Sequence, residues 1–266
     1  MLQPLHGTAL KLATWNVNSL SVRLPQLLAW LAEHPVDAIV LQETKLTDDK
    51  FPHAEIEAAG YRAQWFGQRT YNGVALLSRG ESVEVVRNIP GFDDEQARVI
   101  AASTGGLRVI GAYFPNGQAP DSEKFSYKMR WMEALRDWIG TQLAEHPRLV
   151  LLGDYNIAPE DRDVHDPVAW QGSVLVSAAE RAELQALLQA GFADVFRRFE
   201  QAEKSYSWWD YRQGAFRRNA GLRIDLILAS QALAERCVSS TIDREPRRVE
   251  RASDHTPVLA AFDISV

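Results

Sequence analysis

The sequence has 266 residues, of which 46% are hydrophobic and 24% are charged, and its formal net charge is −6. This composition is typical of a globular protein and excludes a disordered or collagen-like chain. The single cysteine, Cys237, excludes a disulfide within the chain, so we expect a cytoplasmic protein. No apolar run approaches the ~18 residues of a membrane-spanning helix, and residues 1–10 lack a signal-peptide pattern, so we expect neither membrane insertion nor secretion.

The hydrophobic pattern predicts strands with helices between them. In chain order, we predict a strand at 10–17, a helix at 24–33, strands at 37–42, 73–78, 97–103 and 108–114, a helix at 121–146, a strand at 149–155, a helix at 178–190, and strands at 224–229 and 257–263. Ser122 is placed to begin the long helix, and Gly191 is placed to end the third one. The chain has no repeat and no long linker, so we predict one domain over residues 1–266, with packed sheets and helices outside them.

Charge is unevenly distributed along the chain. Residues 197–251 contain 12 basic and 8 acidic side chains, although the whole chain is acidic. Two interpretations remain open at this point: an ordinary solvated surface, or a surface that faces phosphate groups.

Polar side chains gather where the predicted strands end. These residues are Asn16 and Asn18, Glu43, Asp154 and Asn156, Asp225, and Asp254 with His255. Each alone is explained by a turn, but together they predict side chains that converge on one site. Asp225 is the most informative, because an ionised carboxylate between aliphatic residues costs several kcal/mol unless it is paired or binds metal.

The types of residue at these positions indicate a chemistry. Carboxylate and amide oxygens suit Mg²⁺ or Mn²⁺, whereas the six histidines and the single cysteine show no zinc-site spacing. Phosphate-binding loops of nucleotide-binding proteins and a nucleophile elbow are both absent from the sequence. Hydrolysis by an activated water is the reaction that remains.

Eight short strings, in register over nearly the whole chain, resemble the exonuclease III family. They are WNVN at 15–18, LQETK at 41–45, GVA at 73–75, YFPNG at 113–117, GDYNIAP at 153–159, SWWDYR at 207–212, GLRID at 221–225 and SDHTP at 253–257. The resemblance implies an α+β fold, a four-layered αββα sandwich like that of DNase I. It also implies Mg²⁺-dependent cleavage of DNA phosphodiesters: removal of nucleotides from 3′ ends, incision at abasic sites and trimming of 3′ blocking groups.

The resemblance also implies a metal site. Glu43 matches the family's principal metal ligand, and Asn16 and Asp254 lie beside it in the motif pattern. The remaining candidate ligands are Asp154, Asn156 and His255.

For catalysis, the resemblance implies that Asp154 activates or orients the attacking water, and that Asn156 and Tyr113 hold phosphate oxygens. His255, oriented by Asp225, would contact the scissile phosphate. Either Asp154 or His255 could accept the proton of the water, and the sequence leaves this open.

The resemblance places a DNA-binding surface in the basic segment. Its candidate residues are Trp208, Trp209, Tyr211, Arg212, Arg217, Arg218 and Arg223, together with Arg98. We expect one of the two tryptophans to lie in the core and the other against DNA. A second group on the long helix, Lys124, Lys128 and Arg130, either faces phosphate or forms a solvated helix face.

Two departures from the family pattern are small: Tyr155 replaces the usual Phe, and Ala97 replaces the usual Gly. Residues 160–176 are a larger departure, because their family counterpart varies and lies near the scissile nucleotide. Exonuclease action and abasic-site incision could separate there.

We therefore expect a monomeric DNA-repair nuclease that binds double-stranded DNA, uses Mg²⁺, and needs no nucleotide cofactor or membrane. Two alternatives remain: a catalytically inactive nucleic-acid-binding protein on the same fold, and a phosphodiesterase that acts on RNA.

Overall fold

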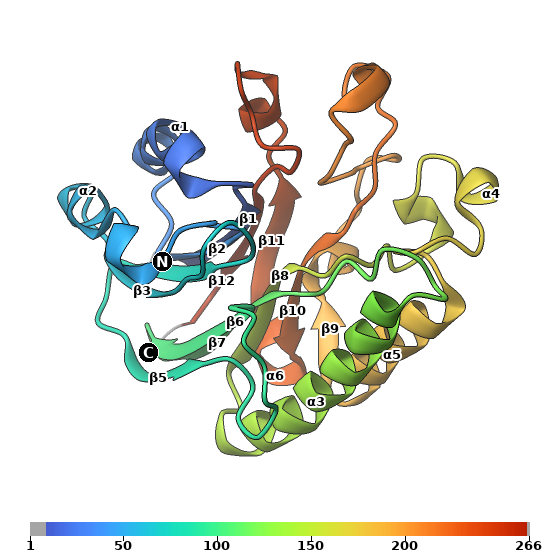
Figure 1. Cartoon of the computed structure of the whole chain (residues 1–266). Coiled ribbons are helices and arrows are strands. Elements are labelled where there is room, and N and C mark those ends of the chain that lie inside the picture. Colours follow the sequence, from blue (N-terminus) through green and yellow to red (C-terminus); the bar gives the residue numbers. More distant parts are fainter. Residues whose placement is uncertain (1–8, 265–266) are drawn as a thin grey trace, which may run out of the picture.

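The computed structural model describes residues 9–264 and contains two six-stranded sheets packed face to face (Figure 1). The first sheet has the order β11 (Cys237–Ile242), β12 (Val258–Phe262), β1 (Leu10–Asn16), β2 (Ala38–Gln42), β4 (Val74–Ser78) and β3 (Arg62–Phe66). The second has the order β5 (Val83–Arg87), β6 (Val99–Thr104), β7 (Leu107–Tyr113), β8 (Leu149–Asp154), β10 (Asp225–Ser230) and β9 (Phe192–Asp194). Only the β1 and β2 pair and the β7 and β8 pair are parallel.

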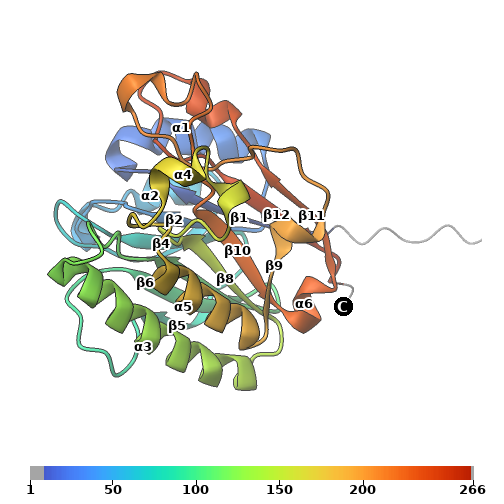
Figure 2. The same ribbon diagram turned by 90° about the vertical axis from the view of Figure 1, so that its right-hand side faces the viewer.

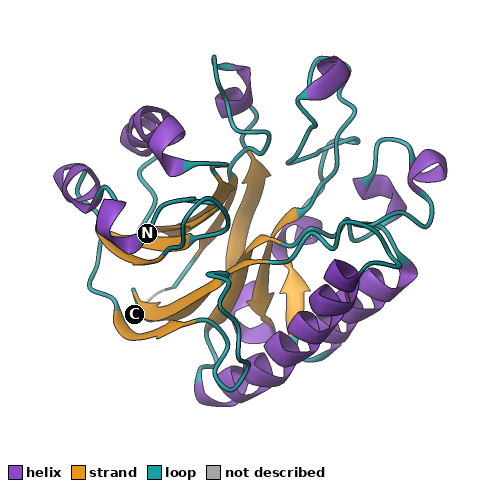
Figure 3. Cartoon of the chain, in the orientation of Figure 1, coloured by secondary structure: helices purple, strands orange, loops and turns teal. Residues whose placement is uncertain are grey.

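Helices cover the outer face of each sheet (Figures 2 and 3). The helices are α1 (Leu20–Glu33), α2 (His53–Ala58), α3 (Glu123–Glu145), α4 (Pro167–Trp170), α5 (Ala178–Gln189) and α6 (Gln231–Ala234). Short 3₁₀ turns are η1 (Asp48–Lys50), η2 (Asp161–Asp163), η3 (Val195–Arg198), η4 (Arg212–Gly214) and η5 (Glu245–Arg248).

Three apolar clusters hold the layers together. One fills the space between the sheets, a second packs α3 and α5 against the second sheet, and a third packs α1 and α2 against the first. The layer order is therefore helix, sheet, sheet, helix, which confirms the predicted αββα sandwich. No helix within residues 9–264 is both long enough and apolar enough to cross a membrane.

All eight predicted strands are confirmed, with ends that differ by at most two residues. The predicted long helix begins after Ser122, whose side chain accepts a hydrogen bond from the Phe125 amide. Gly191 follows α5 at a φ of 123°, as predicted. The helix predicted at 24–33 begins earlier, at Leu20. Pro25 lies in its second turn and does not end the helix.

The register of the strands brings distant residues to one end of the sandwich. Asn16 pairs with Gln42 at the ends of β1 and β2, and in the second sheet Asp154 lies between Tyr113 and Asp225. The strand ends that carry the predicted polar residues are therefore neighbours.

Candidate active site

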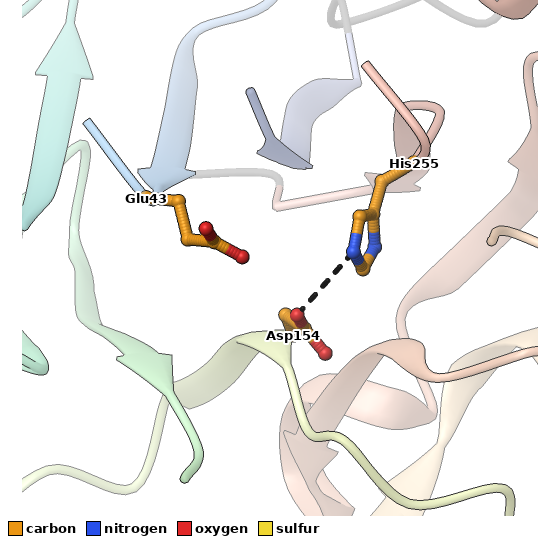
Figure 4. Close-up of side chains that lie close together, drawn as sticks. All are labelled: Glu43, Asp154 and His255. Carbon is orange, nitrogen blue, oxygen red and sulfur yellow. Dashed lines mark ion pairs between the residues drawn. The ribbon is translucent and has the colours of Figure 1, made fainter. Parts of the chain in front are cut away.

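Glu43, Asp154 and His255 point toward one another at this end of the sandwich (Figure 4). Glu43 follows β2, Asp154 ends β8, and His255 precedes β12. One potential ligand atom from each of the three lies within 4.8 Å of those of the other two. Residues more than 200 positions apart in sequence thus form one cluster.

Asn16 joins the two carboxylates of this cluster. Its side-chain nitrogen donates hydrogen bonds to Glu43 Oε1 and to Asp154 Oδ2, both at 2.9 Å. The Tyr113 hydroxyl donates to the same Glu43 oxygen at 3.0 Å. The Asn16 oxygen, the atom that would bind a metal, accepts a hydrogen bond from the Asn18 amide. In this structure, Asn16 is therefore a donor between carboxylates that come from different sheets.

His255 lies between two buried carboxylates. Its Nδ1 is 2.9 Å from Asp225 Oδ2, and its Nε2 is 3.6 Å from Asp154 Oδ2. Burial lowers the pKa of His255, but the charges of Asp225 and Asp154 outweigh burial and raise that pKa to about 10. For the carboxyl group of Asp154 burial acts in the opposite direction and raises the pKa to about 7, although the His255 charge opposes this rise. Asp225, the carboxylate singled out in the sequence, thus has the partner that its burial requires.

Asn156 and Tyr113 lie beside Asp154. The Asn156 amide donates to Asp154 Oδ1 at 2.9 Å, and the Asn156 side-chain nitrogen donates to the Phe114 carbonyl at 3.0 Å. Asn156 has a φ of 49°, a left-handed conformation that asparagine tolerates better than most residues. Burial and the nearby carboxylates of Glu43 and Asp154 raise the pKa of Tyr113 well above its ordinary value, so its hydroxyl remains a donor.

Asp254 is a neighbour of the cluster rather than a member of it. Its two carboxylate oxygens accept hydrogen bonds from the Asn18 side chain at 2.9 Å and from the Trp208 indole at 3.0 Å. The three-residue cluster that could hold a metal within the described residues does not include Asp254. Of the six predicted ligands, Glu43, Asp154 and His255 are grouped, while Asn16 and Asn156 lie beside them.

The sequence interpretation missed two residues at this site. Lys45 lies 2.9 Å from Glu43 Oε2 and balances its charge, and it also donates to the Asn18 side chain. The Ser207 hydroxyl accepts hydrogen bonds from the backbone amides of Ile224 and Asp225 and so fixes the start of β10. Both lie inside the strings LQETK and SWWDYR, which was the available signal.

Two cations that the sequence analysis placed on the surface are buried instead: Arg223, predicted to face DNA, and Lys128, expected either to face phosphate or to lie on a solvated helix face. Arg223 is 1% exposed, and its guanidinium binds Asp163 and Asp194 at 2.7 Å each. Lys128 is 0% exposed and pairs with Glu180 at 2.5 Å. The predicted phosphate contact of Arg223 is wrong, and Lys128 takes neither of its two expected positions, because each cation is enclosed with carboxylate partners.

The other predicted surface residues differ in exposure. Trp209 is fully buried and is the core tryptophan, whereas Trp208 is only partly buried. The side chains of Tyr211, Arg212, Arg217, Arg218, Lys124 and Arg130 are exposed. Arg98 is nearly buried, with its guanidinium 4.9 Å from the centre of the Tyr113 ring, and it lines a cavity of about 610 Å³ next to that residue.

Residues 160–176 contact the wall of the site. Val164 pairs with Leu222 in an isolated bridge, and the rings of Trp170 and Trp208 meet edge to face with centroids 6.5 Å apart. The Trp208 ring in turn lies 6.5 Å, centroid to centroid, from the His255 ring, so residues 160–176 are one side chain away from the cluster of Glu43, Asp154 and His255.

Comparison with known proteins places these features in context. A model of the Endonuclease/Exonuclease/phosphatase family matches residues 13–255. Exodeoxyribonuclease III of Haemophilus influenzae is 37% identical over 266 residues, which cover 95% of this chain and 100% of that protein. The 3′ phosphatase NExo from Neisseria, solved bound to a product DNA hairpin, is 47% identical with a TM-score of 0.95, and 96% of this chain and 100% of that chain are covered. An AP endonuclease from Archaeoglobus fulgidus is 39% identical with a TM-score of 0.93, with the same coverage.

Proposed function

Since the chain belongs to the Endonuclease/Exonuclease/phosphatase family, we propose that it is a DNA-repair nuclease that hydrolyses phosphate esters at 3′ ends and at abasic sites of duplex DNA. The observation that carries this proposal is the convergence of Glu43, Asp154 and the Asp225 and His255 pair at one end of the sandwich. These are the groups that hydrolysis of a phosphodiester by water requires: a site for a cation, a base and a preorganised donor. A binding protein that had lost hydrolysis would not need to keep all of them.

A divalent cation fits the donor set. Glu43 and Asp154 accept hydrogen bonds from the same side-chain nitrogen of Asn16, and two carboxylates so close together would be stabilised by a bound cation. Their hard oxygen atoms favour Mg²⁺, with Mn²⁺ as the second choice. We propose that Glu43 and Asp154 hold the ion, which supplies Lewis-acid neutralisation of the phosphate when bound.

We assign the proton transfers from geometry. His255 Nδ1 is hydrogen-bonded to Asp225, and its Nε2 lies at an ion-pair distance of 3.6 Å from Asp154, so the two carboxylates together favour the doubly protonated ring. His255 is therefore the donor to the phosphate oxygen, and Asp154 is the group that orients the attacking water and accepts its proton. The Tyr113 hydroxyl, held as a donor beside Glu43, binds a second phosphate oxygen. Asp225 keeps the imidazole ring in place and charged.

The test uses the Asp154→Asn variant and two substrates. One is a duplex with a recessed 3′ end that carries a phosphate, and the other contains an internal abasic-site analogue. We expect the wild-type chain to process both with Mg²⁺ and neither with a chelator. We expect the variant to lose at least about 10³-fold in kcat with an unchanged circular dichroism spectrum. Turnover by the variant at the wild-type rate would refute the assigned mechanism.

The two substrates also distinguish action at 3′ ends from incision at abasic sites. Action on the 3′ phosphate alone would make the chain a 3′-end enzyme and would direct attention to residues 160–176, which contact Trp208 through Trp170. Cleavage of the corresponding RNA duplex at an equal rate would instead favour an RNA phosphodiesterase.

A further inference from the structure

Three arginines of one loop stack on a single aromatic ring. The guanidinium carbons of Arg244, Arg247 and Arg248 lie 5.4, 5.1 and 5.9 Å from the centre of the Phe216 ring. Arg244 also lies over Trp209 at 5.2 Å, and Arg247 lies over Tyr211 at 5.2 Å. We call Arg244, Arg247 and Arg248 the arginine stack.

The arginine stack has little negative charge of its own. Within residues 9–264, the only salt bridge of the three is between Arg248 and Glu245, and both of those side chains are largely exposed. The Nε atoms of Arg244 and Arg247 are buried, and no atom of residues 9–264 accepts a hydrogen bond from either. Burial and the neighbouring Arg248 lower the pKa of Arg244, and burial lowers the pKa of Arg247. Arg244 and Arg247 are thus held by aromatic rings and not by carboxylates, and Arg248 has one exposed carboxylate partner besides the Phe216 ring.

The arginine stack adjoins the candidate active site. Tyr211, which lies under Arg247, donates from its hydroxyl to the Ala252 carbonyl and is 3.4 Å from the Asn18 side chain, which holds Asp254. The loops that contain η4 and η5 extend side by side beyond the same end of the sheets (Figures 1 and 2). A ligand that spans the polar cluster and continues past Tyr211 would meet these arginines next.

We propose that the arginine stack binds the phosphodiester backbone of duplex DNA away from the bond that is cleaved. The inference rests on the proposed function and extends its DNA surface to a loop of the basic segment 197–251 that lies outside the eight motif strings. Guanidinium groups suit phosphate because their planar forks match its oxygens. The aromatic rings orient the arginines and bury part of each side chain, so that less entropy is lost when DNA binds.

The test compares two triple variants with equal charge changes. Arg244→Gln/Arg247→Gln/Arg248→Gln removes the arginine stack. Arg62→Gln/Arg148→Gln/Arg236→Gln removes three exposed arginines next to strand ends far from the site. Affinity for a duplex of about 30 base pairs is measured by fluorescence anisotropy with a chelator present, over a series of salt concentrations. Because each lost phosphate contact lowers the slope of log K against log salt by about 0.9, the first variant should show a slope smaller by about 2 to 3 and at least tenfold weaker binding.

The outcomes are separable. Equal slopes and affinities for the two triple variants would overturn the inference. If the first variant unfolds, the single variant Arg248→Gln, which changes an exposed side chain, should still lower the slope by about 1. Cleavage of a short hairpin by the wild-type chain tests the proposed function separately. Hairpin cleavage with no effect of the arginine stack would refute this inference alone.

Discussion

The buried pair of Lys128 and Glu180 makes a strong prediction about stability. Lys128 Nζ donates to Glu180 at 2.5 Å and to the carbonyl oxygens of Asn156 at 2.7 Å and Asn116 at 3.3 Å. Lys128→Met would leave a carboxylate and two carbonyl oxygens without this donor in a dry environment. Breaking a buried ion pair costs about 3 to 5 kcal/mol. We expect the free energy of unfolding to fall by about 3 kcal/mol, the lower end of this range, because Glu180 keeps the hydrogen bonds that it accepts from Leu175 and Ser177.

Urea unfolding followed by tryptophan fluorescence measures this loss. The matched control is Lys124→Met, which changes an exposed lysine one turn earlier on α3 and should shift stability by less than about 0.5 kcal/mol. The double variant Lys128→Met/Glu180→Gln removes both charges and should recover part of the loss. Since Asn156 donates to Asp154 and is itself held by Asn116, kcat should also fall in the single variant. A loss below about 1 kcal/mol for Lys128→Met would refute the reasoning, because the buried carboxylate would then not need its partner.

Three further outcomes are expected. Arg223→Leu should lower the free energy of unfolding by about 3 kcal/mol in the same urea assay, because Asp194 loses its ion-pair partner and Asp163 keeps only Arg197; an unchanged midpoint would contradict this. Asp225→Asn should lower kcat by about 10²-fold or more while leaving DNA affinity within about twofold, since the imidazole loses the charge that orients it; equal kcat values would contradict the role of Asp225. Burial raises the pKa of Cys237 to about 11, so alkylation by iodoacetamide should be slow at pH 8, where about 0.1% is thiolate, and should rise tenfold per pH unit toward pH 11. The unfolded chain in urea, which should react much faster at pH 8, is the control.

The strands that the sequence predicted and those that it missed differ in their position in the sheets. All eight predicted strands are flanked on both sides by other strands, and the four missed strands, β3, β5, β9 and β11, are the edges of the two sheets. Interior strands are covered on both faces, so their sequences are nearly continuous apolar runs. Edge strands such as β5 are half exposed and therefore carry charged side chains, which hides them from a hydrophobic pattern.

The polar cluster was predictable for a related reason. Interior strands must end in apolar-to-polar transitions, and acidic residues at such transitions are visible in a single sequence. The contacts that set their protonation are not visible, because Asp225 and His255 are 30 residues apart and belong to different sheets: Asp225 begins β10 and His255 precedes β12, so they meet only where the two sheets pack together. The expected roles of these residues came from the resemblance to the family, whereas the distances between their side chains come from the structure.

Basic residues were the hardest to interpret, since a lysine or arginine looks the same in sequence whether it faces DNA or the interior. What separates them is whether the fold brings a carboxylate to them: Glu180 comes to Lys128 from 52 residues away, and Asp163 comes to Arg223 from 60. Arg212 is paired locally with Asp210, whereas Arg217 and Arg218 have no carboxylate partner in the part of the chain that the structure describes. An arginine already paired with a carboxylate must give up that contact to bind phosphate, and an unpaired one need not. The exposed arginines without such a partner are therefore the ones whose loss should weaken DNA binding most, and Arg212 should matter less than its place in the motif suggests.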